Sequence, residues 1–246
     1  MKAGNRQSNK AGVPLSCRDC ALGPGTIYRG VHRQAPDHLT AARSCINRLK
    51  AHRIVFHRGE VPDKVFTVYK GWLCRYRDLG RGRYQILNFI IPGDTITLSS
   101  MFMPGQTLSF SVKTLTDVEL CSFPAETFRG LLSQKAEYLQ PYHQDLSGYM
   151  DTITTRLADL GQRSAKGRMA QLFVELYRRH QKRHMLHDGG FAFPVSQAIL
   201  ANALGITKSY VNRTLSTMRD EGLIALEEGR LSVPALAALE RCAVVY

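Results

Sequence analysis

Apolar positions near the C-terminus recur at steps of three and four residues. Such steps place side chains on one face of a helix. Two short runs follow this rule, and their apolar positions are Leu200, Leu204, Val211, Leu215 and Met218. Gly205 lies between the runs, where a tight turn needs the left-handed backbone that glycine adopts without strain. The pattern predicts two helices joined by a turn within residues 193–224.

The second of these helices has a polar face opposite its apolar one. The polar positions are Lys208, Ser209, Asn212, Arg213 and Ser216. Ser196 and Thr207 each stand just before a helix, where a hydroxyl caps free backbone N–H groups. Arg can grip guanine O6 and N7 with two hydrogen bonds, and Asn can do so with adenine. We therefore interpret the segment as a helix-turn-helix that enters the major groove. The alternative is a helical hairpin whose polar face is merely solvated.

A seven-residue repeat of apolar positions predicts one long helix over residues 139–161. Its members are Leu146, Met150, Ile153, Leu157 and Leu160, and the row extends back through His143 and Leu139. Pro141 suits the first turn of such a helix. Steps that stay near 3.5 residues are typical of two helices packed side by side. Because the chain holds one copy, we expect a parallel dimer of two chains. The alternative is that the row packs on the β-domain of its own chain.

Between Arg53 and Phe123 the pattern changes to short β-rich runs that alternate with turns. The turn signals are Gly59, Gly71 and the segments 79–82, 92–94 and 104–105. Runs at this spacing favour an antiparallel sandwich or barrel, here a jelly roll. Helical spacing on either side predicts two short helices. One covers residues 37–52 through Leu39, Ala42, Ile46 and Leu49, and the other covers 124–138 through Phe128, Leu131 and Leu132.

Further elements complete the C-terminal part. Residues 164–184 have the spacing of an amphipathic helix, with Met169, Leu172, Phe173 and Leu176 facing inward. Residues 223–233 predict a β-hairpin, the wing of a winged helix, and 234–246 predict a final short helix. The chain thus divides into a flexible basic arm (1–36), a β-roll (37–138), a dimerisation helix (139–161) and a winged helix-turn-helix domain (162–246). This organisation is of the α+β class.

Charge favours a polyanionic partner. The formal net charge is +13 and the pI is about 9.7, a balance that suits nucleic acid or an anionic membrane. The excess is uneven. Residues 1–60 carry 11 Lys and Arg against 3 Asp and Glu, residues 61–160 carry 10 against 10, and residues 161–246 carry 12 against 7. The arm is therefore more basic than the DNA-reading part, and its charge either touches flanking phosphates or keeps the chain in solution.

Several functional classes find no support in the sequence. No run of about 18 apolar residues predicts a membrane span. The first residues lack the apolar stretch of a secretory signal, so we expect a cytoplasmic protein whose six cysteines are thiols or ligands. His180, His184 and His187 have helical spacing, but neighbouring cations oppose a metal there. No nucleophile–base motif, P-loop or paired-glycine fingerprint is present, so no enzyme is indicated.

The order of these parts resembles the Crp/Fnr family of bacterial transcription regulators, in its FNR/FixK-like branch. The residues that carry the resemblance lie within roughly 40–235 and are Gly59-Glu60, Gly71-Trp72, Pro92-Gly93-Asp94, Leu115-Thr116-Asp117-Val118-Glu119, Arg168-Met169-Ala170, Leu204-Gly205-Ile206-Thr207 and Val211-Asn212-Arg213. The resemblance implies a homodimer that binds a two-fold symmetric site on double-stranded DNA. It also implies a β-roll that senses a signal or contacts RNA polymerase.

In that family the recognition helix places an acidic residue and an Arg on base edges. Arg213 matches the Arg, whereas Ser209 stands at the acidic position, so the half-site should differ from the family's commonest one. Asn212 stands where members often have Ser or Gly, and it could read a base. Gln197 matches a position that touches phosphate. Thr207 and Lys208 complete the expected DNA-binding set.

The family's cyclic-nucleotide sites use a Glu after the Gly-Asp turn and an Arg-Ser pair before the next strand. Leu98 stands at the Glu position, and Leu108-Ser109 stands at the Arg-Ser. A cyclic phosphate needs a cation, which Leu108 cannot supply. We therefore do not expect cyclic AMP binding.

Other members hold a [4Fe–4S] cluster with three clustered N-terminal cysteines and one cysteine in the β-roll. Cys17 and Cys20 match two of the clustered set, and Cys121 matches the β-roll ligand. Thr26 stands at the third clustered position and cannot serve as a thiolate, although Cys45 could substitute; four thiolates are the usual requirement. A cluster is one expectation. The other is a vestigial or redox-reactive C-x-x-C, with Cys121 simply buried in a strand.

The sequence leaves one favoured function and two alternatives. The first is a homodimeric, sequence-specific transcription regulator whose β-roll senses a signal other than a cyclic nucleotide, such as oxygen or redox state. The second is a ligand-binding β-roll whose C-terminal domain contacts proteins, and a regulator that responds to a cyclic nucleotide is a further alternative. Steep loss of duplex DNA binding with salt favours the first.

Overall fold

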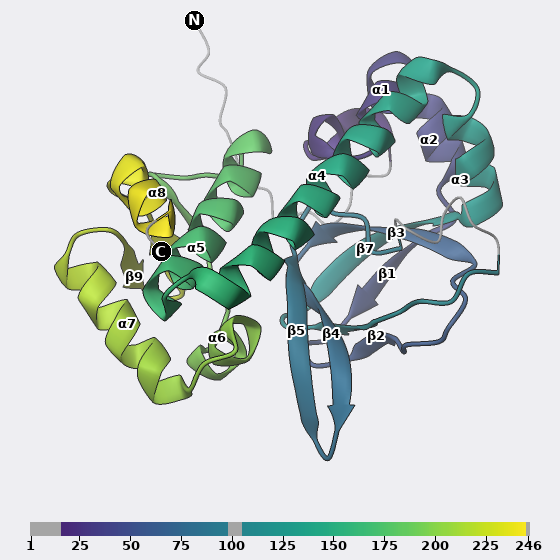
Figure 1. Ribbon diagram of the computed structural model, residues 1–246. Helices are drawn as coiled ribbons and strands as arrows, with labels where there is room; N and C mark the ends of the chain where they lie inside the picture. The colour runs from purple at the N-terminus through teal and green to yellow at the C-terminus, as the bar shows by residue number, and fades with distance from the viewer. Residues whose placement is uncertain (1–15, 98–104, 245–246) are drawn as a thin grey trace, which may run out of the picture.

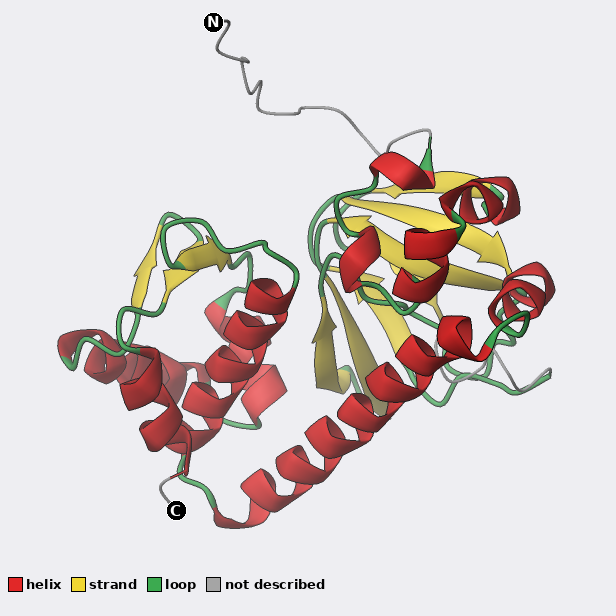
Figure 2. Cartoon of the chain, turned by 90° about the horizontal axis from the view of Figure 1, so that it is seen from above, coloured by secondary structure: helices red, strands yellow, loops and turns green. Residues whose placement is uncertain are grey.

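The computed structural model describes residues 16–97 and 105–244, and the side chains of 158–162 also lie outside this description. The chain forms an N-terminal half built on β-strands and a C-terminal half of helices with one small sheet (Figure 1). The long helix α4 (Ala136–Gln162) runs along the N-terminal half and leads to the C-terminal one (Figure 2). The predicted α+β organisation is confirmed.

Two antiparallel sheets form the β-roll. One contains β1 (Cys45–Leu49), β7 (Val118–Pro124) and β3 (Lys64–Lys70), in that spatial order. The other contains β2 (Ile54–Phe56), β6 (Ser111–Thr114), β4 (Leu73–Gly80) and β5 (Arg83–Ile90). Alternating residues of both sheets fill the core between them, and the fully buried ones include Val68, Leu73, Ile90, Val112 and Leu120. The predicted jelly roll is therefore confirmed.

Residues 16–36 are not the mobile arm that their composition predicts. They form the 3-10 turns η1 (Cys17–Asp19) and η2 (Gly23–Gly25) and the helix α1 (Arg29–Gln34). Tyr28 and Val31 are buried in one apolar cluster with Phe123 and Phe128 of the roll. Gly and Pro at this density predict a loop, but here four apolar side chains anchor the turns to the core. Residues 1–15, the rest of the expected arm, lie outside the described residues.

The helix expected over residues 37–52 is only half right. Helix α2 (Pro36–Ala42) begins at the proline and ends at Ala42, and the chain then continues as strand β1. Ile46 lies opposite Cys121 and Leu49 opposite Val118, because β1 pairs with the central strand β7. Backbone pairing across the sheet thus overrides a helical spacing that only about three turns of sequence supported.

The short helix α3 (Ala125–Leu132) buries the three side chains expected of it. Helix α4 begins at Ala136, earlier than predicted, so Pro141 lies in its interior instead of its first turn. Proline has no N–H and leaves the carbonyl of Glu137 without its helical partner. Gly30 of α1 packs on that carbonyl so closely that a Cβ would lie 2.4 Å from the oxygen. Gly30 and Pro141 together let α1 and α4 approach backbone to backbone.

The predicted apolar row on α4 is covered by its own chain only at the start. Leu139 and Leu146 pack against the cluster beneath α1. Farther along, Met150 is 56% exposed and Leu157 is 67% exposed. Ile153 is half-buried, and the side chain of Leu160 lies outside the description. The alternative that the whole row packs on the chain's own β-domain is therefore excluded for Met150 and Leu157.

The C-terminal half contains the predicted winged helix. Helix α5 (Ala165–Lys182) is followed by β8 (Gly190–Ala192), α6 (Gln197–Leu204), α7 (Lys208–Asp220), β9 (Ala225–Glu227), β10 (Arg230–Ser232) and α8 (Leu236–Val244). The three strands form one antiparallel sheet in the order β8-β10-β9. The apolar faces of α5, α6 and α7 converge on a buried cluster that includes Phe173, Leu200, Val211 and Leu231. The wing is thus the β9–β10 hairpin, extended by β8.

The two halves share one apolar core. Trp72 and Phe89 of the roll belong to the same buried cluster as Phe191 and Phe193 of the C-terminal half. The ring of His180 on α5 packs against both Trp72 and Phe191, with centroid distances of 5.7 and 4.0 Å, and those two rings also contact each other at 6.5 Å. His180 is 2% exposed, and its Nδ1 lies 2.8 Å from the carbonyl oxygen of Leu176. It therefore belongs to the core and is not part of an exposed histidine row.

A buried carboxylate ties the same two halves together. Asp94 follows β5, and its side chain, 17% exposed, accepts hydrogen bonds from Arg179 and Arg183 of α5. Arg183 also donates to the carbonyl of Pro92 at 2.7 Å, and Arg179 donates to that of Phe89 at 3.2 Å. Burial alone would raise the pKa of Asp94, but the two guanidinium groups hold that pKa at about 2. The turn 92–94 is thereby fixed on α5.

Replacing Asp94 by Asn should destabilise the protein by about 3 kcal/mol, because the largely buried Arg183 loses the carboxylate at 2.6 Å and Arg179 keeps only its ion pair with Glu175 at 3.1 Å. The measurement is the free energy of unfolding from urea titration at pH 7. Asp117→Asn is the matched control, since Asp117 pairs with Lys50 in solvent, with side chains 62% and 82% exposed, and such pairs contribute little. Equal stability of Asp94→Asn and Asp117→Asn would contradict the role given to Asp94.

His180 should make the protein less stable as the pH falls. The pKa of His180 is lowered to about 4, chiefly by burial and also by the charges of Arg179 and Arg183, which together outweigh the raising effects of the hydrogen bond to Leu176 and the charge of Asp94. The unfolded chain takes up the proton near pH 6.5, before the folded protein does, so the free energy of unfolding declines from about pH 6.5 toward pH 4.

The expected decline from this group is about 3 kcal/mol between pH 7 and pH 4. His180→Phe keeps a ring packed against Trp72 and Phe191 and cannot titrate. Urea unfolding at a series of pH values should show the wild type losing about 3 kcal/mol relative to the variant. Parallel profiles for the two proteins would show that His180 titrates alike in both states.

Candidate nucleic-acid interface

The helix-turn-helix is built by three local devices. The hydroxyl of Ser196 accepts a hydrogen bond from the backbone N–H of Ile199, and that of Thr207 accepts one from Tyr210, both at 3.3 Å. Gly205 has φ of 65° and turns the chain between α6 and α7. Each device satisfies backbone groups that a helix end leaves free. The sequence predicts all three.

Helix α7 is divided into a buried and an exposed face. Val211, Leu215 and Met218 are at most 3% exposed and pack on α6 and the rest of the domain. The exposed positions are Lys208, Ser209, Asn212, Arg213 and Ser216. Thr207 is also exposed, and Gln197 at the start of α6 is half-buried. The DNA-binding residues expected from the sequence are therefore accessible on α7 and, in part, at the start of α6.

Two contacts between side chains on the exposed face fix its arrangement within the free protein. The guanidinium carbon of Arg213 lies 4.7 Å from the ring centroid of Tyr210, a cation–π contact within one helical turn. The hydroxyl oxygens of Thr207 and Ser209 are 3.1 Å apart. Tyr210, 40% exposed, was not singled out from the sequence, although a large aromatic residue on a polar helix face was a signal. Its ring limits where Arg213 can point.

The N-terminal half holds α6 in place through one asparagine. The side-chain amide of Asn202 donates to the carbonyl of Tyr84 at 2.6 Å and accepts from the N–H of Ile86 at 2.8 Å. Gln85 donates to the Asn202 carbonyl at 2.6 Å. These bonds join α6 to β5, which sequence reasoning did not predict because both partners are ordinary polar residues. The helix-turn-helix therefore has a fixed position against its own roll.

The three cysteines expected as cluster ligands differ in how far they are buried. Cys17 and Cys121 are buried in the same apolar cluster, and Cys20 is half-buried. Burial raises the pKa of Cys17, and it raises that of Cys121 to about 12 although Arg43 lowers it. Burial therefore favours the thiol form of both groups, and a cluster would have to displace their protons to bind them as thiolates.

The fourth ligand that a [4Fe–4S] cluster needs is not supplied by the candidates. Thr26 is fully buried and donates its hydroxyl proton to the carbonyl of Gly23. Cys45 lies opposite Ser122 in the sheet and Cys121 lies opposite Ile46, so the two thiols are on different faces. Within residues 16–97 and 105–244 no three His, Cys, Asp or Glu side chains are grouped to hold a metal. These residues do not fit a four-thiolate cluster, and the cluster stays a prediction that iron analysis would test.

The positions that match a cyclic-nucleotide site have a structural role where they are described. Leu108 is 2% exposed and packs in the core of the roll, and Leu98 lies outside the described residues. Arg75, missed by sequence reasoning, is a buried cation on β4. It donates to the carbonyls of Thr95 and Ile96 at 2.9 Å and lies over the rings of Phe110 and Tyr149. Its charge is engaged between the roll and α4.

Two family models match the chain. A cyclic nucleotide-binding domain matches residues 46–135, and a Crp-like helix-turn-helix domain matches residues 167–242. These ranges correspond to the β-roll with α3 and to the winged helix. Among the described helices, none combines the length and apolar character that crossing a bilayer requires.

Curated relatives match most of the chain at low identity. A probable transcriptional activator of Rhizobium leguminosarum is 24% identical over 94% of this chain and 95% of its own. The transcriptional activator protein anr of Pseudomonas aeruginosa is 25% identical over 93% and 91%, and FnrL of Cereibacter sphaeroides is 25% identical over 74% and 73%. The structure of FixK2 from Bradyrhizobium japonicum superposes with a TM-score of 0.71 at 20% identity, over 82% of this chain and 98% of that one.

Proposed function

We propose that this chain acts as a homodimer whose two α7 helices read half-sites one helical turn apart on double-stranded DNA. The proposal starts from the fact that the chain belongs to the Crp/Fnr family of transcription regulators. Its helix-turn-helix is that of a DNA-binding regulator, and the chain is not an enzyme. The observation that carries the proposal is the exposed face of α7. It presents Lys208, Asn212 and Arg213 on a helix whose other face is buried.

The residues on that face divide into two roles. Arg213 and Asn212 have the donor geometry that discriminates guanine and adenine edges in the major groove. Lys208, Ser209 and Gln197, with the capped turn at Thr207, lie nearer the helix N-termini, where phosphate contacts fix the register of the protein on the duplex. Because Ser209 carries no charge, it adds no acidic contact to a cytosine amino group.

The exposed part of α4 supports the homodimer. Met150 and Leu157 present large apolar side chains to solvent on the same face of a helix, at a seven-residue spacing. Monomeric proteins rarely expose such a continuous row, and pairing with the same row of a second copy would bury it in knobs-into-holes fashion. Such pairing places the two α7 helices about a common two-fold axis, as a symmetric operator requires.

The β-roll would act as the sensor or as a platform for RNA polymerase, in the cytoplasm where the chromosome lies. A signal other than a cyclic nucleotide suits the residues present, since Leu108 offers no cation and Arg75 is engaged by carbonyls and rings. Oxygen or redox state remains a candidate, with Cys17, Cys20 and Cys121 as thiols. Such a signal would act by shifting the population between two arrangements of the dimer.

Arg213→Ala should reduce operator affinity by about 10-fold to 100-fold, because a bidentate contact to guanine contributes about 1–3 kcal/mol. The measurement is fluorescence anisotropy with duplexes selected from a random pool by the wild type. Arg219→Ala, an exposed cation near the other end of α7, is the matched control and should bind like the wild type. Normal binding by Arg213→Ala would exclude this face as the reader.

Leu157→Asp should convert the dimer to a monomer at micromolar concentration, because a carboxylate would be buried at the centre of the α4 pair. Sedimentation velocity gives the oligomeric state. Gly148→Asp is the control: Gly148 lies on the opposite face of α4, and a Cβ there meets nothing within 4 Å. A wild type that sediments as a monomer, or a Leu157→Asp variant that remains dimeric, would contradict the proposed interface.

A further inference from the structure

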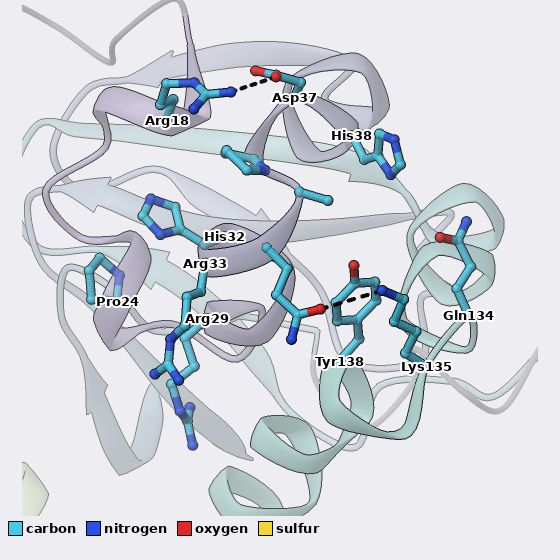
Figure 3. Close-up of a pocket in the computed structure, with 13 residues that line it drawn as sticks. Arg18, Pro24, Arg29, His32, Arg33, Asp37, His38, Gln134, Lys135 and Tyr138 are labelled. Atoms are coloured by element: carbon cyan, nitrogen blue, oxygen red, sulfur yellow. Dashed lines mark hydrogen bonds and ion pairs between the residues drawn. The ribbon is translucent and has the colours of Figure 1, made fainter.

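A cavity of about 780 Å³ lies in the N-terminal half, away from the helix-turn-helix. Its walls come from η2, α1, α2 and the turn between α3 and α4 (Figure 3). A volume of this size lies within the range of small-molecule sites. Most of the segment that forms one side, residues 18–36, belongs to the arm that the sequence predicts to be mobile, and folding it against α4 creates the cavity.

The charged residues that line the cavity are mainly cations. Arg18, Arg29, Arg33 and Lys135 line it together with a single carboxylate, Asp37. Asp37 is engaged by Arg18 at 2.7 Å, and Arg29 is paired with Asp145 at 3.2 Å. Arg33 and Lys135 have no carboxylate within ion-pair distance in the described part of the chain. Arg33 on α1 and Lys135 before α4, both exposed, are therefore two positive charges of the lining that no carboxylate in the described residues compensates (Figure 3).

The two sides of the cavity are held at a fixed separation. Gln34 on α1 accepts a hydrogen bond from Lys135 at 3.5 Å and donates one to Glu137 at 2.5 Å. Arg29 donates to Gln144 at 2.6 Å, and Gly30 packs on the carbonyl of Glu137. These contacts tie α1 to the first turns of α4 on one side of the opening. A ligand would meet a site whose walls are already in place, which lowers the entropy cost of binding.

We propose that this cavity binds a small anion with two or more negative charges, carried by phosphate or carboxylate groups, that bridges Arg33 and Lys135. Guanidinium and ammonium groups are the donors that recognise such oxygens. Helix α4 starts at Ala136, directly after Lys135, so its free N–H groups add a favourable field for an anion. His38 of α2 also lines the cavity and supplies a further polar group (Figure 3).

The position of the site gives it a regulatory consequence, which rests on the proposed function. One bridging anion would contact α1 through Arg33 and the start of α4 through Lys135. Helix α4 carries Met150 and Leu157 of the proposed dimer row farther along. An anion that binds one packing of α4 more tightly than another shifts the dimer toward that packing and changes the relative position of the two reading helices.

Isothermal titration calorimetry on the full-length protein at low salt tests the site. The probes are inorganic pyrophosphate and citrate. They are titrated separately, so that the two titrations distinguish a site for phosphate groups from a site for carboxylate groups. We expect saturable binding of at least one probe with one site per chain. Binding of neither probe would overturn the proposal.

Arg33→Gln and Lys135→Gln should each weaken that binding about tenfold or more, the usual loss when a charged hydrogen-bond donor is removed. Arg77→Gln is the matched control, since Arg77 is an exposed cation on β4 outside the cavity and its loss lowers the net charge equally. Unchanged thermal unfolding of the three variants shows that they fold. If the three variants bind the anion equally well, or if Arg77→Gln weakens binding as much as the other two, then binding depends only on net charge. Either result would overturn the proposed site.

Operator affinity, measured with and without the anion that binds, separates this proposal from the proposed function. A change in operator affinity with the wild type that disappears in Arg33→Gln supports the site and its regulatory role. Operator binding by a wild type that takes up neither probe overturns the anion site and leaves the DNA-binding proposal in place. Saturable anion binding by a protein that binds no selected duplex supports the site and contradicts the proposed function.

Discussion

The position of the reading helix depends on one buried carboxylate. Asp94 accepts hydrogen bonds from Arg179 and Arg183 and thereby fixes the turn that ends β5 against α5. Two carbonyls of the same turn region, those of Phe89 and Pro92, receive the remaining guanidinium donors. An apolar contact alone would allow sliding, since burial is not directional. The charged hydrogen bonds set the register in which Trp72, His180 and Phe191 stack, and this register places the whole winged helix.

The sequence predicts best those features that depend on neighbouring residues. Helix caps at Ser196 and Thr207, the left-handed turn at Gly205 and the buried face of α7 follow from spacing and residue type within one or two turns. The exposed reading face follows as well, because it is the other side of the same helix. The family resemblance added the assignment of roles to Arg213 and Ser209, and no local rule could have supplied it.

Features that depend on contacts far apart in the sequence escaped prediction. Residues 45–49 have helical spacing but become β1, because pairing with β7 satisfies more backbone groups than one more helical turn. Residues 16–36 have the composition of a loop but fold, because Tyr28 and Val31 find Phe123 and Phe128 about 95 residues away. The contacts of Asn202 and Asp94 also join segments far apart in the sequence and could not be predicted. Their partners are backbone carbonyls, amides and arginines that nothing in the local sequence marks.

These attachments decide how a signal could reach the DNA. Separating Asp94 from both arginines would cost several kcal/mol, and separating α6 from β5 would also break the three hydrogen bonds of Asn202 and Gln85. Allosteric coupling energies are typically about 1–3 kcal/mol, which is too little to open such an interface. Each chain therefore moves as a unit, with its reading helix fixed to its own roll. In the proposed dimer, the distance between the two α7 helices would then change most easily through the packing of one α4 against the other. An effector that acts at the start of α4, as we propose, would need to change only that least constrained contact.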